Sequence, residues 1–190
     1  MIAWAVAGIL VPSLALLAGC GAMQEVKHHQ VEIRVPAPAA RPVPARARLV
    51  LLAADARQEP GLSRTEEYAL REKAPLPTTL LAAAAPRMRA AGIEPLEDRE
   101  SRMASGQIAV VLTRLEAKLE KTRWLASAAL TVEAADNLGR PTGRWEAIGR
   151  GAHDDTRIMA GAAGLALGKA IGEALDRIPW AQVGRARPSP

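Results

Sequence analysis

The sequence has little cysteine and few aromatic residues. One cysteine, Cys20, occurs in 190 residues, so no disulfide can form within the chain. Phenylalanine is absent, and there are one tyrosine and four tryptophans, yet apolar residues make up 49% of the chain. A hydrophobic core is therefore feasible, but small side chains, mainly alanine, must fill it. Such a core requires the backbones of neighbouring elements to approach closely.

The first 24 residues contain no charged side chain. In the remaining chain, the excess of positive charge lies in the segments before and after the predicted domain. The net charge is +5 and the isoelectric point is about 10.0. Residues 20–48 and the tail arginines Arg185 and Arg187 account for all of it, so residues 49–183 are neutral overall. A neutral domain argues against nucleic acid as a partner. The basic flanks are either solvated or attracted to anionic lipid headgroups.

The motifs of common enzyme classes are also absent. We find no phosphate-binding glycine loop, no nucleophile elbow and no pair of catalytic carboxylates. His28-His29 is a poor zinc site, because adjacent side chains diverge and no third ligand is near. His153-Asp154-Asp155 resembles a metal or catalytic cluster, but we interpret it as the cap of a following helix. The sequence therefore predicts no enzymatic activity, no metal and no bound cofactor.

The amino-terminal segment carries the most specific signal. Residues 2–18 form an apolar run that ends in small residues, as secretory signals do. Leu17-Ala18-Gly19-Cys20 resembles the lipobox of bacterial lipoprotein precursors. This resemblance implies cleavage before Cys20, a diacylglycerol on its thiol and an acyl chain on its amino group. Several acyl chains anchor a protein almost irreversibly.

Two alternatives to a lipoprotein signal remain open. An uncleaved transmembrane helix is long enough to span a bilayer, although Pro12 and the glycines beside Cys20 disfavour it. An ordinary signal peptide with an incidental cysteine is the second. By resemblance to enterobacterial lipoproteins, Gly21 implies delivery to the periplasmic face of the outer membrane, with inner-membrane anchoring as the alternative.

A proline-rich segment precedes the predicted domain. Residues 35–47 contain four prolines and favour either polyproline II or disorder. We therefore predict four regions: a signal peptide at 1–19, a lipidated flexible tether at 20–47, a periplasmic domain at 48–183 and a disordered basic tail at 184–190.

Hydrophobic periodicity predicts the elements of the domain. We expect strands at 49–52, 126–134 and 145–149. Between the first two lie an apolar run at 108–112 and an alternating segment at 115–119, which we interpret as strand although it also fits a helix. Asp55-Ala56-Arg57 ends the first strand or forms an ion pair, and we favour the strand end. Residues 58–76 are predicted to be a loop. A helix is expected from Thr78 to Ala91, stopped by Gly92 and kinked or shortened by Pro86.

The last predicted element is a helix over residues 158–178. Its distinctive feature is a glycine at every fourth position: Gly164, Gly168 and Gly172. Each glycine costs about 1 kcal/mol relative to alanine in a helix, so the run needs a packing reason. This smooth face packs against the domain's own sheet or against another copy or partner.

These elements predict an α+β fold. We expect a single mixed or antiparallel sheet of about four strands with two helices on one face. Residues 17–183 resemble the YajG-type family of bacterial envelope lipoproteins in the lipobox, in the strand ending at Asp55, in the Ala-Leu-Thr-Val strand at 129–132 and in the last helix. The auxiliary lipoproteins of lipid-transport ABC systems share a similar plan.

The sequence analysis leads to one main functional hypothesis. The chain is expected to be a lipid-anchored, non-enzymatic module that binds another envelope protein or a lipid, in an oligomeric state the sequence leaves open. The alternatives are an accessory of an ABC-type lipid transporter and, less favoured, an enzyme that acts on the cell wall.

Overall fold

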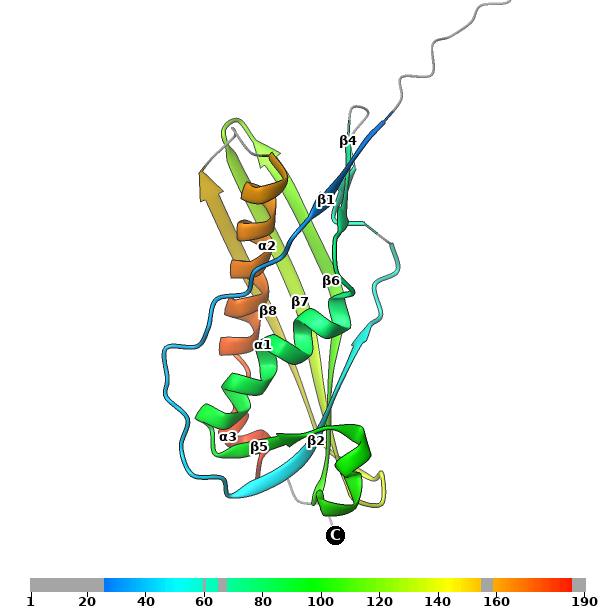
Figure 1. Cartoon of the computed structure of the whole chain (residues 1–190), viewed down its shortest axis with the longest axis vertical. Coiled ribbons are helices and arrows are strands. Elements are labelled where there is room, and N and C mark those ends of the chain that lie inside the picture. The colour runs from blue at the N-terminus through cyan, green and yellow to red at the C-terminus, as the bar shows by residue number, and fades with distance from the viewer. Residues whose placement is uncertain (1–25, 60, 65–67, 155–158, 186–190) are drawn as a thin grey trace, which may run out of the picture.

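The computed structural model describes residues 26–59, 61–64, 68–154 and 159–185, which form two sheets and two long helices (Figure 1). The strands are β1 (Lys27–Val31), β2 (Ala47–Asp55), β3 (Ser63–Arg64), β4 (Tyr68–Glu72), β5 (Ile93–Leu96), β6 (Gly106–Glu120), β7 (Arg123–Asp136) and β8 (Pro141–Asp154). The helices are α1 (Leu76–Ala90), the 3₁₀ helix η1 (Asp98–Met103), α2 (Met159–Asp176) and α3 (Trp180–Val183).

The prediction of a single sheet of about four strands is wrong, although the α+β class holds. The larger sheet has five strands in the order β5-β2-β6-β7-β8, and a second sheet has the order β1-β4-β3. The second sheet draws its strands from residues 58–76, predicted to be a loop, and from residues 27–31, placed in the tether. Strands of two to five residues offer too few positions for a periodic pattern to stand out.

The long antiparallel strands of the large sheet follow the sequence pattern. Residues 106–120 form one strand with a bulge between Leu112 and Arg114, so the ambiguous 115–119 segment is extended. β7 and β8 form the predicted hairpin, and Gly139 has φ +77° in its turn. β2 pairs with β6 only as far as Leu112. Beyond that point the second sheet lies beside β6, where the Ala117 N–H donates to the Leu62 carbonyl at 2.7 Å.

Helix α1 confirms most of its prediction. Leu80 and Met88 are completely buried in the core, and Gly92 has φ +78° just beyond the helix end. Pro86 does not shorten the helix, which continues to Ala90. Burial of one face on both sides of the proline holds the last turn in place.

Helix α2 packs on the large sheet through residues with almost no side chain. A Cβ added to Gly149 of β8 would lie 2.0 Å from the Ala170 carbonyl oxygen, and one added to Gly151 would lie 1.9 Å from that of Ala166. Five alanines on the facing side of α2 are buried: Ala162, Ala163, Ala166, Ala170 and Ala174. The close backbone approach expected of a core without phenylalanine is therefore present.

The chain between β1 and β2 runs along the domain rather than away from it. Residues 32–36, which we call the strap, lie along α2, and farther on the Arg46 N–H donates to the Gly92 carbonyl at 2.7 Å. Figure 1 shows this segment passing in front of α2 before it enters β2. The described residues 26–47 thus lie on the domain, whereas the prediction treats residues 20–47 as a flexible tether. Seven residue steps separate Cys20 from the first strand.

Candidate functional site

The residues predicted to carry the lipid anchor lie outside the described residues. This holds for Leu17, Ala18, Gly19 and Cys20. None of the helices in the described part of the chain is long and apolar enough to cross a membrane.

The two histidine motifs occupy strands. His28 and His29 belong to β1, and His153 and Asp154 end β8. Asp154 forms an ion pair with Arg123 at 3.0 Å across the sheet, whereas the third member of its motif, Asp155, lies outside the described residues. Among the described residues, no three His, Cys, Asp or Glu side chains are grouped as a metal site would need.

The three glycines of α2 face the strap. A Cβ on Gly164 would lie 2.3 Å from the Glu32 carbonyl oxygen, and one on Gly168 would lie 2.0 Å from that of Arg34. At Gly172 the nearest atom is Pro36 Cδ at 3.3 Å. The smooth helix face therefore receives an extended segment of the same chain. No side chain larger than hydrogen fits at the first two positions without moving the strap.

Arg87 joins the strap to both long helices. Its side chain is 3% exposed, and its Nε donates to Asp176 Oδ1 at 2.7 Å. Its Nη2 donates to the Pro36 carbonyl at 3.1 Å, and its Nη1 donates to the Ala83 carbonyl at 2.9 Å. The buried charge is thus compensated by a carboxylate and by main-chain oxygens, as a buried cation requires.

Arg57 forms a second junction, between β2 and β4. Its Nε and Nη2 donate to the two oxygens of Asp55 at 2.8 Å each, and Nη2 also reaches Glu72 at 3.2 Å. Nη1 donates to the Gly61 carbonyl at 2.9 Å. Hydrogen bonding to Arg57 holds the pKa of the Asp55 carboxyl below its usual value, although partial burial opposes this shift. β2 ends at Asp55, and Asp55 and Arg57 also form an ion pair, so both interpretations of the Asp55-Ala56-Arg57 motif hold.

Side chains of α2 cap the outer edge of β8. Lys169 Nζ donates to the Ala152 carbonyl at 3.0 Å, Glu173 accepts from the Arg150 N–H at 2.6 Å, and Arg177, just after the helix, donates to the Ile148 carbonyl at 2.6 Å. The three capping residues are spaced four positions apart, and the β8 main-chain groups that they bond, two carbonyls and one N–H, are spaced two positions apart. Edge strands template unwanted pairing unless their free groups are covered. These caps cover the middle of the β8 edge.

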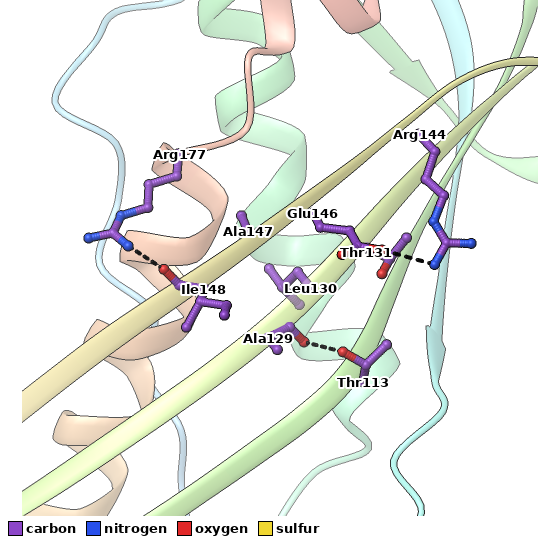
Figure 2. A pocket seen from close by; sticks show the side chains of 9 residues that line it. All are labelled: Thr113, Ala129, Leu130, Thr131, Arg144, Glu146, Ala147, Ile148 and Arg177. Atoms are coloured by element: carbon purple, nitrogen blue, oxygen red, sulfur yellow. Dashed lines mark hydrogen bonds and ion pairs between the residues drawn. The ribbon is translucent and has the colours of Figure 1, made fainter.

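The candidate binding site is a groove on the face of the large sheet opposite α1 and α2. Figure 2 shows this face, with the helices behind the strands. The groove has a volume of about 520 Å³ and is lined by Thr113, Ala129, Leu130, Thr131, Arg144, Glu146, Ala147, Ile148 and Arg177. Ile148 lies directly opposite Ala129 in the β7–β8 register and is 50% exposed, so an apolar side chain projects from this face on the edge strand β8.

The charged groups of the groove and Thr113 have partners within the chain. Arg144 pairs with Glu133 at 3.3 Å and with Glu146 at 3.1 Å, and Arg177 pairs with Glu173. Thr113 Oγ1 donates to the Ala129 carbonyl at 3.2 Å (Figure 2). Since each arginine has a carboxylate partner, the groove favours an apolar or weakly polar surface over an isolated anion.

Sequence reasoning did not find the groove or the two arginine junctions. The groove is formed by residues of several neighbouring strands, and the sequence of one strand does not show which strands pair with it. One signal was available for the edge caps: Lys169, Glu173 and Arg177 recur at helical spacing on an otherwise apolar helix. A buried Arg87 has no local signature, because its carboxylate partner is 89 positions away.

The chain shares its fold with a solved bacterial protein. It is similar to protein XCC0632 from Xanthomonas campestris, described under the family model DUF330, with 14% identity over 84% of this chain and 94% of that one and a TM-score of 0.52. Lipoprotein GNA1162 from Neisseria meningitidis (9% identity, 56% of this chain, 83% of that chain, TM-score 0.41) and PelC, a dodecamer from Paraburkholderia phytofirmans (16%, 74%, 91%, 0.40), are more distant.

At the level of sequence, neither a scan against protein-family models nor a search of curated proteins gives a match. The Xanthomonas structure establishes a shared fold. The resemblance to the YajG-type family specifically stays a prediction.

Proposed function

We propose that the chain is a lipid-anchored protein of the bacterial envelope that acts as a non-enzymatic binding module. The observation that carries this proposal is the groove on the face of the large sheet opposite α1 and α2, with its exposed Ile148. Its charged groups are engaged within the chain, so the face can receive another surface without leaving buried charges uncompensated.

The anchor in this proposal is Cys20. The lipobox-like Leu17-Ala18-Gly19-Cys20 follows an uncharged apolar run, which supports export and acylation of the thiol and of the new amino group. Gly21 favours delivery to the outer membrane, where the domain would face the periplasm. The resemblance to the YajG-type family supports the same location.

The anchor is tested by mass analysis of the mature protein. A mature chain that begins at Cys20 and carries two or three acyl chains supports the proposal. Cys20→Ala should give an unprocessed chain of unacylated mass. A wild-type protein that begins at Met1 or carries no acyl chain contradicts it.

The groove is tested by site-specific photocrosslinking of the full chain in cells. A crosslinking residue at position 148 should give one defined adduct. The matched control is position 165. Leu165 is also exposed, but it lies on α2, which packs on the face of the sheet opposite the groove. Equal products at both positions, or none at 148, contradict the binding role. An adduct with phospholipid in place of protein would favour the accessory of a lipid transporter.

A further inference from the structure

We propose that the domain stands end-on upon an anionic bilayer, with the turn between β6 and β7 directed at the lipid headgroups. This inference rests on the proposed anchor at Cys20 and adds to it the orientation of the domain. We call the end that contains residues 27, 68, 118–124 and 153–154 the proximal end.

Strand pairing brings these segments together at one end of the molecule. β1 and β4 are parallel, with Lys27 opposite Tyr68, and the Tyr68 ring meets the Trp124 ring edge-on with centroids 6.2 Å apart. Trp124 lies opposite His153 at the end of β8. The first residues of β1 therefore lie beside the β6–β7 turn, at the upper end in Figure 1.

The other end of β7 is far from this point. β7 has 14 residues, which at about 3.3 Å per residue separate its two turns by about 45 Å. The distal turn contains Leu138, and β5 and η1 lie at the same end, because β6 starts beside β2 where β7 finishes.

The chain length before β1 selects the proximal end. Seven residue steps connect Cys20 to Lys27, and a fully extended chain covers at most about 25 Å over that length. The strap and the proline-rich segment are folded onto the domain, so they add no reach. With acyl chains on Cys20, the distal turn can touch the bilayer only if the domain lies flat.

Among the described residues, the proximal end carries an excess of two positive charges. The exposed basic side chains are Lys27, Lys118, Lys121 and Arg123, and the exposed acidic ones are Glu120 and Asp154, which pair with Lys118 and Arg123 at 3.0 Å each. Anionic lipids attract such basic groups within a Debye length of the surface. Attraction of this excess charge to the headgroups would favour contact at this end.

The orientation is tested with fluorescent labels on the lipidated full chain. Because acylation consumes the thiol of Cys20, Thr122→Cys and Leu138→Cys each add one reactive cysteine at an exposed turn. The proteins are inserted in vesicles of phosphatidylethanolamine and phosphatidylglycerol that contain a headgroup-linked quencher. We expect several-fold stronger quenching at position 122 than at 138. Equal quenching, or stronger quenching at 138, overturns the proposal.

Charge reversal provides the second arm of the experiment. Lys118→Glu combined with Lys121→Glu should reduce quenching at position 122, whereas the matched distal pair Arg99→Glu and Arg102→Glu should leave it unchanged. An equal effect of both pairs also overturns the proposal. Intact mass of the same samples separates the two ideas. Acyl chains on Cys20 with a quenched distal label refute only the orientation, whereas missing acyl chains refute the anchor and the orientation with it.

Discussion

Two nearly buried arginines join parts of the chain that are distant in sequence. Arg57 links the end of β2 to β4, and Arg87 links α1, α2 and the strap. The guanidinium group suits this work, since its five N–H donors can serve several acceptors at once. Removal of such a side chain leaves its acceptors without a donor, which costs more than the loss of an exposed ion pair.

Arg87→Met should lower the free energy of unfolding by about 1–3 kcal/mol, because the Pro36 carbonyl loses a donor and Asp176 loses its cation. The cost stays below that of a fully buried pair, since the Asp176 side chain is 56% exposed and can be hydrated. Chemical denaturation measures the difference.

The matched control for this variant is Arg89→Met on the same helix. Arg89 is 46% exposed and only 3.7 Å from Glu94, so this variant should change stability by less than about 0.5 kcal/mol. Equal losses in the two variants would show that the junction at Arg87 contributes nothing particular.

The pair Asp55–Arg57 should make stability depend on pH. The pKa of Asp55 is lower in the folded state than in the unfolded state. Its contribution is therefore complete above the unfolded pKa, near 4, and is lost as the pH falls through the folded pKa. A double-mutant cycle of Asp55→Asn and Arg57→Met should give a favourable coupling energy at neutral pH that shrinks toward zero in acid. A coupling that is the same at both pH values would contradict this assignment.

At the scale of elements, three sides of α2 make three different sets of contacts. Its alanines pack on the glycines of β8, its glycines receive the strap, and its charged stripe caps the β8 edge. The sequence predicts the helix because its apolar residues recur at helical spacing over 18 residues. It also predicts the β7–β8 hairpin, where long alternation ends in a turn that contains Gly139.

The strap and the second sheet are not predictable in the same way. Proline-rich residues 35–47 have the composition of a linker, and what holds the strap is the space left by Gly164 and Gly168, more than 100 positions away. The two-residue strand β3 likewise exists because β6 extends beyond β2 and leaves an edge to cover. Short elements fixed by tertiary contact carry no period of their own.

Glu173→Ala should open the edge of β8 locally. The Glu173 carboxylate accepts the Arg150 N–H at 2.6 Å, so its removal exposes this amide to solvent. Loss of this hydrogen bond should cost about 1–3 kcal/mol. Hydrogen exchange at the Arg150 amide should therefore accelerate by about one to two orders of magnitude. The amide of Gly149, which faces β7, should be unaffected.

The control for the edge prediction is Glu116→Ala on β6. This carboxylate accepts a hydrogen bond from the Ser127 hydroxyl and from no described main-chain amide. Exchange at Arg150 should therefore match the wild type. If Glu173→Ala leaves exchange at Arg150 unchanged, water satisfies this amide as well as the carboxylate does, and the cap has no protective role.

At the scale of the whole molecule, the amino-terminal segment is part of the folded unit. Val31 belongs to the same buried cluster as Trp124, Leu167 and Ile171, and that cluster extends through both sheets. The candidate groove lies on the opposite face, which none of the described helices covers (Figure 2). The sequence predicts which side chains of β6, β7 and β8 point outward, but only the assembled sheet brings Thr113, Ile148 and Arg177 to one groove.

Integration of the strap predicts how the mature chain responds to trypsin. A flexible tether would be cleaved rapidly after Arg34, whereas a strap packed on α2 should resist until the domain opens. Gly168→Leu places a side chain where even a Cβ would lie 2.0 Å from the Arg34 carbonyl oxygen, so the strap must lift. Cleavage after Arg34, followed by mass spectrometry, should become at least about tenfold faster, the equivalent of about 1.4 kcal/mol of local stability. Gly161→Ala, at an exposed position of the same helix, should leave the rate unchanged. Rapid cleavage after Arg34 in the wild type would show that residues 32–36 do not stay on α2 in solution. The strap would then add its own length to the seven residue steps between Cys20 and β1, and the domain could lie farther from the bilayer.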